Sequence, residues 1–304
     1  MKRRWPRRRR RKERKPPWIV RLLRRRGVRL SPRAEWGLGW LETLAVAGAA
    51  AALIITFVTV RMTVPTVSME PTIMAGDSFF VDRISYHFTQ PGVGNVIVFW
   101  HLEGVQVTSV VPGSAADAAG LREGDWLVAP QIADTGVGGE PVPSLRSLRR
   151  RIEDAQGNEL EATVLREGVG LVPATLEVPS DARDLSGLGI NASISQVRYV
   201  KRLIATGGQT VEIRDGQVYV DGEVLEKVSH HTYWTGASGM RYGVDSTEVP
   251  ENHYFVLGDN TRNSYDSRYF GFVPADDLIG APFFRVWPLG RFGPMNGYFW
   301  SSPW

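Results

Sequence analysis

An uncharged, apolar run of 18 residues, Thr43–Val60, constrains this chain more than any other feature. About this length is the minimum for a helix that crosses a bilayer, and a buried core helix would normally show a polar face. A cleaved leader fits less well because the apolar run is long for one. The sequence therefore predicts a transmembrane anchor over residues 36–61, with Trp36 and Trp40 at the inner interface.

The charge of the chain is divided at this run. Residues 1–35 carry 17 Lys and Arg against Glu13 and Glu35, which leaves 19 of the 36 basic and 30 of the 32 acidic residues for the rest. Such an arm could bind nucleic acid or anionic lipid, and its position before an apolar span favours lipid. We expect a single-pass protein of the cell membrane, with residues 1–35 as a cytoplasmic arm and the body after Arg61 on the exported side. Membrane lipid is an expected partner and nucleic acid is not.

Cysteine is absent, so the chain can form neither disulfides nor thiolate metal sites. The spacing of the histidines matches no metal-binding motif, and each is expected to be a polar surface residue. We expect no metal and no other cofactor. The histidines are His87, His101, His230, His231 and His253.

The body beyond the anchor is predicted to be mainly β. Short runs rich in Val, Ile and aromatic residues alternate with turn residues, and Asp215-Gly216 and Asp221-Gly222 are typical of hairpin turns. The predicted strands are Ser78–Asp82, Asn95–Trp100, Tyr199–Ile204, Thr210–Ile213, Gln217–Val220 and Tyr254–Leu257.

A segment of different texture lies between Trp100 and Tyr199. Its Pro112–Ala115, Ala119–Leu121 and Gly124-Asp125 patterns are followed by a predicted helix, Ser144–Asp154, and a strand near 160–166. The spacing resembles that of a PDZ domain, which implies an inserted α+β module over residues 103–193 with a possible peptide ligand. Residues 187–190, Gly-Leu-Gly-Ile, are a candidate loop for a peptide carboxylate, and a plain linker is an equally good interpretation.

Three short boxes carry the chemistry. They are Pro65–Thr72 (PTVSMEPT), Tyr199–Ile204 (YVKRLI) and Gly258–Arg268 (GDNTRNSYDSR), the last followed by Gly271–Pro274. In this order, behind one apolar span, they resemble the type I signal peptidase family, a group of membrane-bound serine endopeptidases with a Ser-Lys dyad. The resemblance covers roughly residues 40–101 and 196–290.

Ser68 and Lys201 also make chemical sense as a nucleophile and its general base. A serine hydroxyl needs a base, and no motif of a Ser-His-Asp triad is present. A lysine can serve if burial lowers its pKa, and lowering it to about 7 costs roughly 4–5 kcal/mol. Strand alternation places Tyr199 and Leu203 on the face of Lys201 and Arg202 on the other. A solvent-facing lysine is the usual alternative.

The resemblance implies further roles. The Ser68 backbone N–H and the Thr66 hydroxyl would form the oxyanion hole, and Ser264 would orient the Lys201 amine. The ion pair of Asp266 with Arg268 and the close backbone approach at Gly258 would support the third box.

We therefore expect a mainly β fold with an N-terminal transmembrane helix, an all-β catalytic domain over 62–102 and 194–304, and the inserted module. The expected activity is removal of signal peptides from secretory preproteins after small residues of an Ala-x-Ala pattern. A membrane-tethered peptide-binding scaffold without activity is the non-enzymatic alternative. Aromatic residues near the carboxyl end could contact the outer leaflet instead of packing in the core. They are Trp287, Phe292, Phe299, Trp300 and Trp304.

Overall fold

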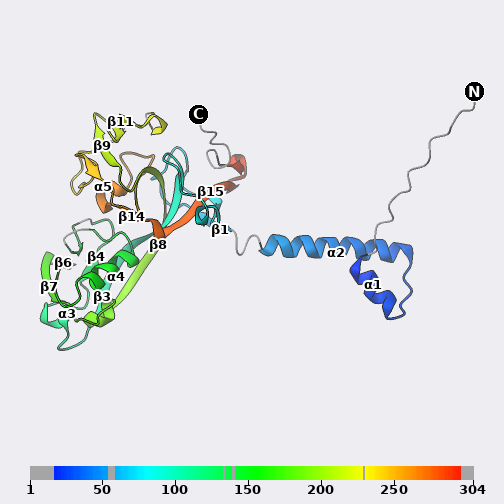
Figure 1. Cartoon of the computed structure of the whole chain (residues 1–304), viewed down its shortest axis with the longest axis horizontal. Helices are drawn as coiled ribbons and strands as arrows, with labels where there is room; N and C mark the ends of the chain where they lie inside the picture. The colour runs from blue at the N-terminus through cyan, green and yellow to red at the C-terminus, as the bar shows by residue number, and fades with distance from the viewer. Residues whose placement is uncertain (1–16, 54–58, 133, 139–140, 229, 296–304) are drawn as a thin grey trace, which may run out of the picture. The chain divides into compact units, whose positions relative to one another are not determined.

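The computed structural model describes residues 17–53, 59–132, 134–138, 141–228 and 230–295 (Figure 1). The chain divides into two compact units, Met1–Val58 and Thr59–Trp304. Predicted features at 1–16, 54–58 and 296–304 lie outside the described residues, and these include Phe299, Trp300 and Trp304.

The described part of the first unit is a pair of helices, α1 (Trp18–Arg25) and α2 (Pro32–Leu53). Glu42 accepts hydrogen bonds from the first backbone N–H groups of α1, those of Trp18 and Ile19, at 3.1 and 3.3 Å. These N–H groups have no partner within their own helix, so a carboxylate there stabilises the helix start. The basic arm predicted over 1–35 is therefore helical over much of its described part.

The predicted anchor has different limits in the structure. Helix α2 begins at Pro32, ahead of the predicted residue 36, and residues 59–61 belong to strand β1 (Thr59–Thr63). Val60 and Arg61 pair with Val81 and Phe80, which shows that strand pairing overrides the apolar pattern at its carboxyl end. Among the described helices, none is long and apolar enough to cross a membrane.

The second unit is built mainly of β-strands. Its larger sheet contains the order β1-β2-β15-β3-β4-β6-β5, and β8 joins β3 on one edge and β13 on the other. A smaller sheet has the order β11-β10-β9-β12. Besides β1 and the two long strands β3 and β8, the strands outside the inserted segment are β2 (Ser78–Asp82), β9 (Thr210–Arg214), β10 (Gln217–Val220), β11 (Glu223–Val224), β12 (Thr247–Glu248), β13 (His253–Leu257), β14 (Val273–Pro274), β15 (Leu278–Trp287) and β16 (Gly293–Pro294).

The sequence-based strands and turns of this unit are confirmed. The predicted hairpin turns have positive φ angles at Asp215 and Gly216, 52° and 77°, and at Asp221 and Gly222, 54° and 82°. Two consecutive residues with positive φ are what a tight hairpin turn requires. Short helices complete the unit: α5 (Ser267–Phe270), η2 (Ser85–His87), η4 (Glu226–Val228), η5 (Ala275–Asp277) and η6 (Leu289–Arg291).

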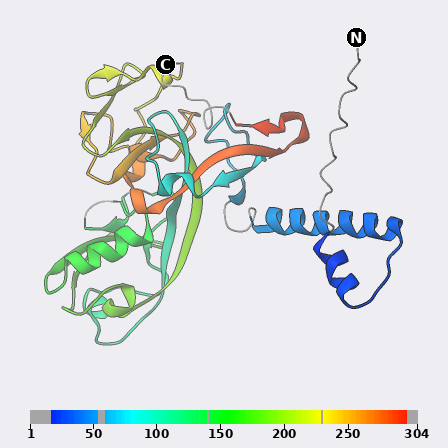
Figure 2. The same ribbon diagram turned by 45° about the vertical axis from the view of Figure 1, so that its right-hand side comes forward.

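Two strands are much longer than the sequence predicted. Strand β3 (Val96–Val110) pairs antiparallel with residues 190–202 of strand β8 (Ile190–Thr206), and the two run side by side (Figure 2). The predicted boundaries of the inserted module, at 102/103 and 193/194, fall inside these strands. The module is thus joined to the remainder of the unit by a continuous two-stranded ribbon. Two loops in its place would have allowed the module to move relative to the rest of the unit.

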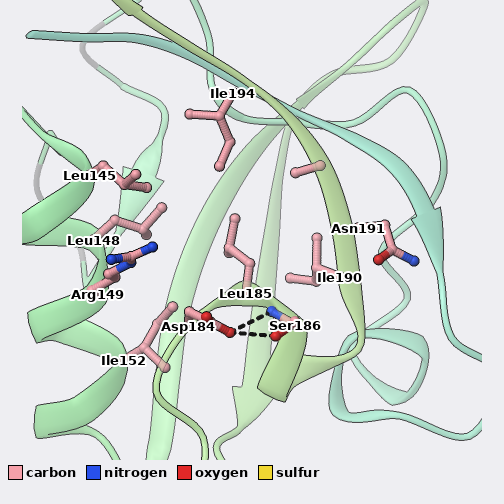
Figure 3. Close-up of a pocket in the computed structure, with 11 residues that line it drawn as sticks. Leu145, Leu148, Arg149, Ile152, Asp184, Leu185, Ser186, Ile190, Asn191 and Ile194 are labelled. Atoms are coloured by element: carbon pink, nitrogen blue, oxygen red, sulfur yellow. Dashed lines mark hydrogen bonds between the residues drawn. The ribbon is translucent and has the colours of Figure 1, made fainter.

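The inserted segment holds α3 (Ala115–Ala118), α4 (Leu145–Asp154), η3 (Leu185–Leu188) and four strands. Ser144 caps α4, since its hydroxyl accepts from the Ser147 N–H. A cavity of about 210 Å³ lies between α4 and the first residues of β8 (Figure 3). The strands are β4 (Trp126–Val128), β5 (Gly136–Val137), β6 (Glu159–Arg166) and β7 (Gly170–Glu177).

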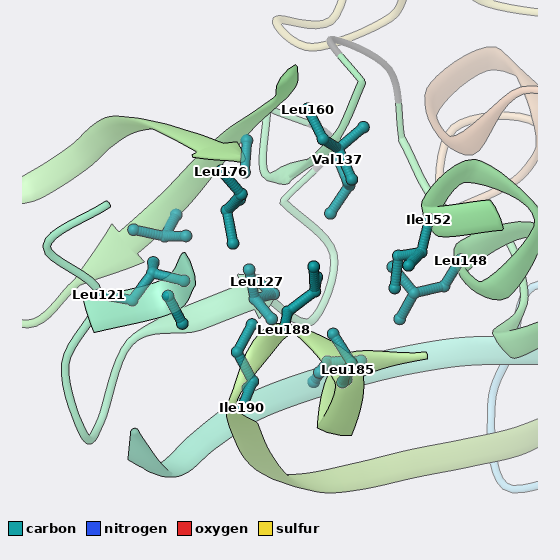
Figure 4. Packing of buried hydrophobic residues seen from close by; sticks show 14 of the residues in the cluster. Leu121, Leu127, Val137, Leu148, Ile152, Leu160, Leu176, Leu185, Leu188 and Ile190 are labelled. Carbon is teal, nitrogen blue, oxygen red and sulfur yellow. The ribbon is translucent and has the colours of Figure 1, made fainter. Parts of the chain in front are cut away.

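The module has its own apolar core (Figure 4). Leu148 and Ile152 of α4 pack into it, and both are fully buried. The buried members of this cluster all fall between Leu102 and Ile190, close to the predicted limits of the insertion.

Candidate active site

Ser68 lies on the loop between β1 and β2, and burial of its neighbour fixes the loop. Met69 is fully buried in an apolar cluster that also contains Val200. Asn260 binds the loop from the third box: its backbone N–H donates to the Ser68 carbonyl at 3.1 Å, and its side-chain Nδ2 donates to the Val67 carbonyl at 3.1 Å. The loop that carries Ser68 is therefore held from both sides.

Lys201 lies on β8 opposite Ile97 of β3, and its side chain is 4% exposed. Its Nζ donates a hydrogen bond of 2.7 Å to the Ser68 Oγ. The same amine lies 5.1 Å from the centre of the Tyr199 ring, and Leu203 is fully buried nearby on the strand. The strand alternation expected from the sequence is thus present, and the solvent-facing alternative for Lys201 is wrong.

The environment of Lys201 favours its neutral form. Burial lowers the pKa of its amine from 10.5 to about 8, the Asp266 and Asp259 charges act in the opposite direction, and the Arg268 charge lowers it further. Desolvation disfavours the protonated amine because the charged form loses the most hydration. A substantial fraction of this lysine is therefore neutral at mildly alkaline pH.

The third box is organised by a buried ion pair. Arg268 donates from Nε and from a terminal guanidinium nitrogen to the two oxygens of Asp266, at 2.8 and 2.9 Å, and both side chains are fully buried. Asp266 also accepts from the Gly258 N–H at 2.9 Å, and Arg268 donates to the Trp234 and Thr261 carbonyls. These bonds use four of the five N–H donors of the guanidinium, and such hydrogen bonds offset the cost of burying its charge.

Gly258 lies where a side chain has no room. A Cβ there would be 2.1 Å from the Ser264 Oγ and 2.5 Å from the Ser68 carbonyl oxygen. The backbone of the third box at Gly258 thus lies directly against Ser68.

Two further residues, Thr66 and Ser264, have predicted roles beside Ser68 and Lys201. The Thr66 hydroxyl lies 3.4 Å from the Ser68 Oγ. The Ser264 Oγ is buried and has no hydrogen-bond partner among the described residues, so its expected bond to Lys201 is not made here.

Sequence reasoning missed a network that links all three boxes. Arg202 donates to the two Asp259 oxygens at 2.7 and 2.6 Å, and the Thr72 hydroxyl donates to the same carboxylate at 2.5 Å. Each residue belongs to a different box. The sequence did offer a signal for this network. Strand alternation places Arg202 on the face of β8 opposite Lys201, and a charged side chain on that face requires a partner there.

His101 contradicts the prediction that every histidine is a polar surface residue. It is 3% exposed, stacks on the Tyr199 ring at 4.3 Å and contacts Phe270 at 4.6 Å. Burial lowers its pKa to about 3, and the charge of Lys201 lowers it further. A neutral imidazole can pack as an aromatic ring, which the residue type alone does not reveal.

A cavity of about 260 Å³ opens beside Ser68 and Lys201. One wall is the loop over residues 64–68, and the other is the part of β8 over residues 197–201. Glu103 and Gln131 from the inserted module also line it. The module therefore borders the site, although the sequence placed it apart from the chemistry.

Comparison with known proteins assigns a family to this arrangement. The model of the family described as signal peptidase, peptidase S26, matches residues 37–135 and 156–287, well over half of the chain. The chain belongs to the signal peptidase family. As a member it is a hydrolase that removes signal peptides from preproteins.

Individual signal peptidases align over most of the chain. It is 26% identical over 257 residues to a probable signal peptidase I-2 of Synechocystis, covering 84% of this chain and 76% of that protein. A signal peptidase I of Leptolyngbya laminosa is 24% identical over 256 residues, covering 84% and 82%. A solved signal peptidase I of Enterococcus faecalis V583 is 37% identical, with a TM-score of 0.23, and the match covers 28% of this chain and 81% of that one.

Proposed function

We propose that this signal peptidase cleaves with a Ser-Lys dyad, in which Ser68 is the nucleophile and Lys201 the general base. The observation that carries the proposal is the 2.7 Å contact between the Lys201 Nζ and the Ser68 Oγ in a buried setting. A base within hydrogen-bond reach, with its pKa lowered toward the working pH, meets both requirements of general base catalysis.

In the first step the neutral Lys201 amine takes the proton of the Ser68 hydroxyl while Oγ attacks the scissile carbonyl carbon. The protonated amine then gives its proton to the leaving amine as the peptide bond breaks, which leaves an acyl ester on Ser68. Water, deprotonated by Lys201, attacks this ester. As the ester bond breaks, Lys201 returns the proton to the Ser68 Oγ and the signal peptide is released. The Ser68 N–H and the Thr66 hydroxyl donate to the oxygen that becomes negative in each step.

The residues of the third box support the dyad. Ser264 would orient the Lys201 amine, and in support of this role its Oγ is buried and has no other hydrogen-bond partner among the described residues. The pair of Asp266 with Arg268 keeps the backbone at Gly258 in place.

The substrates are secretory preproteins cleaved after small residues of an Ala-x-Ala pattern. Support comes from the cleft, whose wall over residues 197–201 of β8 is an extended strand against which an extended peptide can lie. Met62 and Val64 add apolar walls, which suit short side chains that require no polar partner.

We also propose a single-pass membrane location with residues 1–35 in the cytoplasm and the catalytic domain, 62–102 and 194–304, on the exported side. On helix α2, the exposed fractions of Leu41, Leu44 and Val46 are 60% or more. Lipid would cover such side chains. Trp287 and Phe292 are 53% and 59% exposed and could contact the outer leaflet.

Residues 103–193 act as a PDZ-like module that binds a peptide. The cavity between α4 and β8 supports this role, and η3 at its end contains Gly187 of the predicted carboxylate loop.

The test is cleavage of a secretory preprotein by the detergent-solubilised full chain and by the Ser68→Ala and Lys201→Ala variants. Both variants should lose activity to a similar extent, because the two residues act as one unit. Lys227→Ala, which changes an exposed lysine, should cleave normally. Normal turnover by either dyad variant would contradict the mechanism, and the inactive scaffold would be favoured if the unmodified chain cleaved nothing.

A further inference from the structure

Glu103 lies at a break in the pairing of the two long strands. Leu102 pairs with Gln196 and Gly104 with Ser195, so Glu103 is an extra residue on β3 that has no opposite residue on β8. A β-bulge of this kind re-aims a side chain, and bulges are common beside active sites. The side chain of Glu103 lines the catalytic cleft. The bulge thus brings a carboxylate from outside the three boxes into the cleft.

This carboxylate has no cation beside it. Glu103 is half-buried, and among the described residues no lysine, arginine or histidine forms an ion pair with it. It accepts a hydrogen bond from the Ser195 Oγ at a length of 3.4 Å, which is long for such a bond. Burial, and after it the charge of Glu103, raises the pKa of Tyr199 to about 12, so the carboxylate acts on the face of β8 that carries Tyr199. A partly desolvated charge of this kind is stabilised by a ligand that supplies a cation.

The proposed function sets the direction of a preprotein in the cleft. The residues before the scissile bond lie along residues 197–201 of β8, with the bond itself at Ser68 and Lys201. They therefore run parallel to β8. If the first residue before the bond lies opposite Lys201, the fifth lies opposite Val197. Because side chains alternate along a strand, the first, third and fifth residues face the side of β8 that carries Lys201 and Tyr199.

We propose that Glu103 binds a basic side chain of the preprotein at the fifth residue before the scissile bond. This rests on the proposed function. Glu103 follows Leu102, the partner of Gln196, so it lies next to the part of the cleft that the fifth residue occupies. The long side chain of a lysine or arginine reaches the carboxylate from there and forms a charge-assisted hydrogen bond. Cleavage therefore depends on a positive charge as well as on the small residues nearer the bond.

The opposite face of β8 gives this preference a register. Arg198 also lines the cleft, and strand alternation places it on the face opposite Tyr199 and Lys201. The sixth residue before the scissile bond points to the face of Arg198. A basic side chain at the sixth residue meets a like charge, so only the fifth residue is selected in this way.

The experiment compares peptides that share one signal sequence and one Ala-x-Ala cleavage site, with lysine, serine or glutamate at the fifth residue before the bond. The full chain in detergent should cleave the lysine peptide with a kcat/KM about fivefold above that of the serine peptide, which is the range of a partly exposed ion pair. The glutamate peptide should fall below the serine peptide. Lysine moved to the sixth residue should give no gain.

Three variants test whether Glu103 is the source of the preference. In Glu103→Gln the ratio of kcat/KM for the lysine and glutamate peptides should fall to one or below, and in Glu103→Lys the order of the peptides should invert. Glu123→Lys makes the same charge change at an exposed residue outside the cleft and should keep the preference. Each ratio is measured within one variant, so a change in folding yield does not alter it.

The outcomes separate the two proposals. Equal kcat/KM for the lysine and glutamate peptides, a lysine preference that survives Glu103→Gln, or an equal gain from lysine at the sixth residue would overturn the role of Glu103 and leave the protease assignment intact. Failure to cleave any of these peptides would overturn the proposed function, and the role of Glu103 with it.

Discussion

Because Lys201 is buried where its charged form is unfavourable, replacing it with methionine should stabilise the protein while abolishing cleavage. The pKa of its amine falls from 10.5 to about 8 on folding. At about 1.36 kcal/mol per unit, this difference of 2.5 corresponds to about 3 kcal/mol.

The pH dependence follows from the sign of this shift. Between about pH 8 and pH 10.5 the unfolded chain holds a proton on Lys201 that the folded chain has released, so stability rises with pH there. Below pH 8 both states are protonated and the folded state carries the full cost of the buried charge. The stability gained by Lys201→Met should therefore be greatest near pH 7 and smaller by about 3 kcal/mol near pH 10.5.

The assay is denaturant unfolding of detergent-solubilised protein at both pH values, with Lys227→Met as the matched lysine substitution at an exposed site. The kinetic counterpart is kcat/KM, which should fall about tenfold per pH unit below an apparent pKa of about 8. A stability difference that does not change with pH, or an acidic limb near 10.5, would refute the argument that burial makes Lys201 a base.

Three further predictions concern the surroundings of Ser68 and Lys201 and the membrane topology. Arg202→Met should lower the free energy of unfolding by about 3–5 kcal/mol, because it leaves the buried Asp259 carboxylate unpaired, and an Arg202→Met/Asp259→Leu double variant should recover part of this loss in the same unfolding assay. The His101→Phe variant should remain active. As pH falls from 6.5 to 3, its free energy of unfolding should decrease less than that of the unmodified protein, because only the unfolded chain protonates His101 in this range. Loss of cleavage would instead give His101 a role in the reaction. Protease added outside sealed spheroplasts should digest the body after Arg61 and spare the arm, and digestion of the arm would reverse the proposed topology.

Local patterns in the sequence carried much of the fold and pointed to the two residues of the proposed dyad. Hairpin turns such as Asp215-Gly216 follow from the φ angles that a two-residue turn needs. Period-two alternation placed Lys201 on an apolar face, and the three boxes pointed to Ser68 as its partner. Each of these features depends on residues close together in the chain and can therefore be recognised in a short stretch of sequence.

The tertiary structure decided what depends on residues far apart. Thr72, Arg202 and Asp259 are separated by up to 187 positions, and their network exists because β8 and the loops around it bring them together. His101 became a buried ring only because Tyr199 and Phe270 close around it.

The extent of β8 is the clearest case. Its exposed residues 193–196 lack the apolar alternation of a half-buried strand, so the sequence placed a domain boundary there. Pairing with β3 keeps these residues extended, because backbone hydrogen bonds form between strands regardless of the side chains they carry. Side-chain patterns in a sequence indicate which residues are buried. They do not reveal a strand that is held mainly by backbone hydrogen bonds to its neighbour, because that neighbour is known only from the tertiary structure.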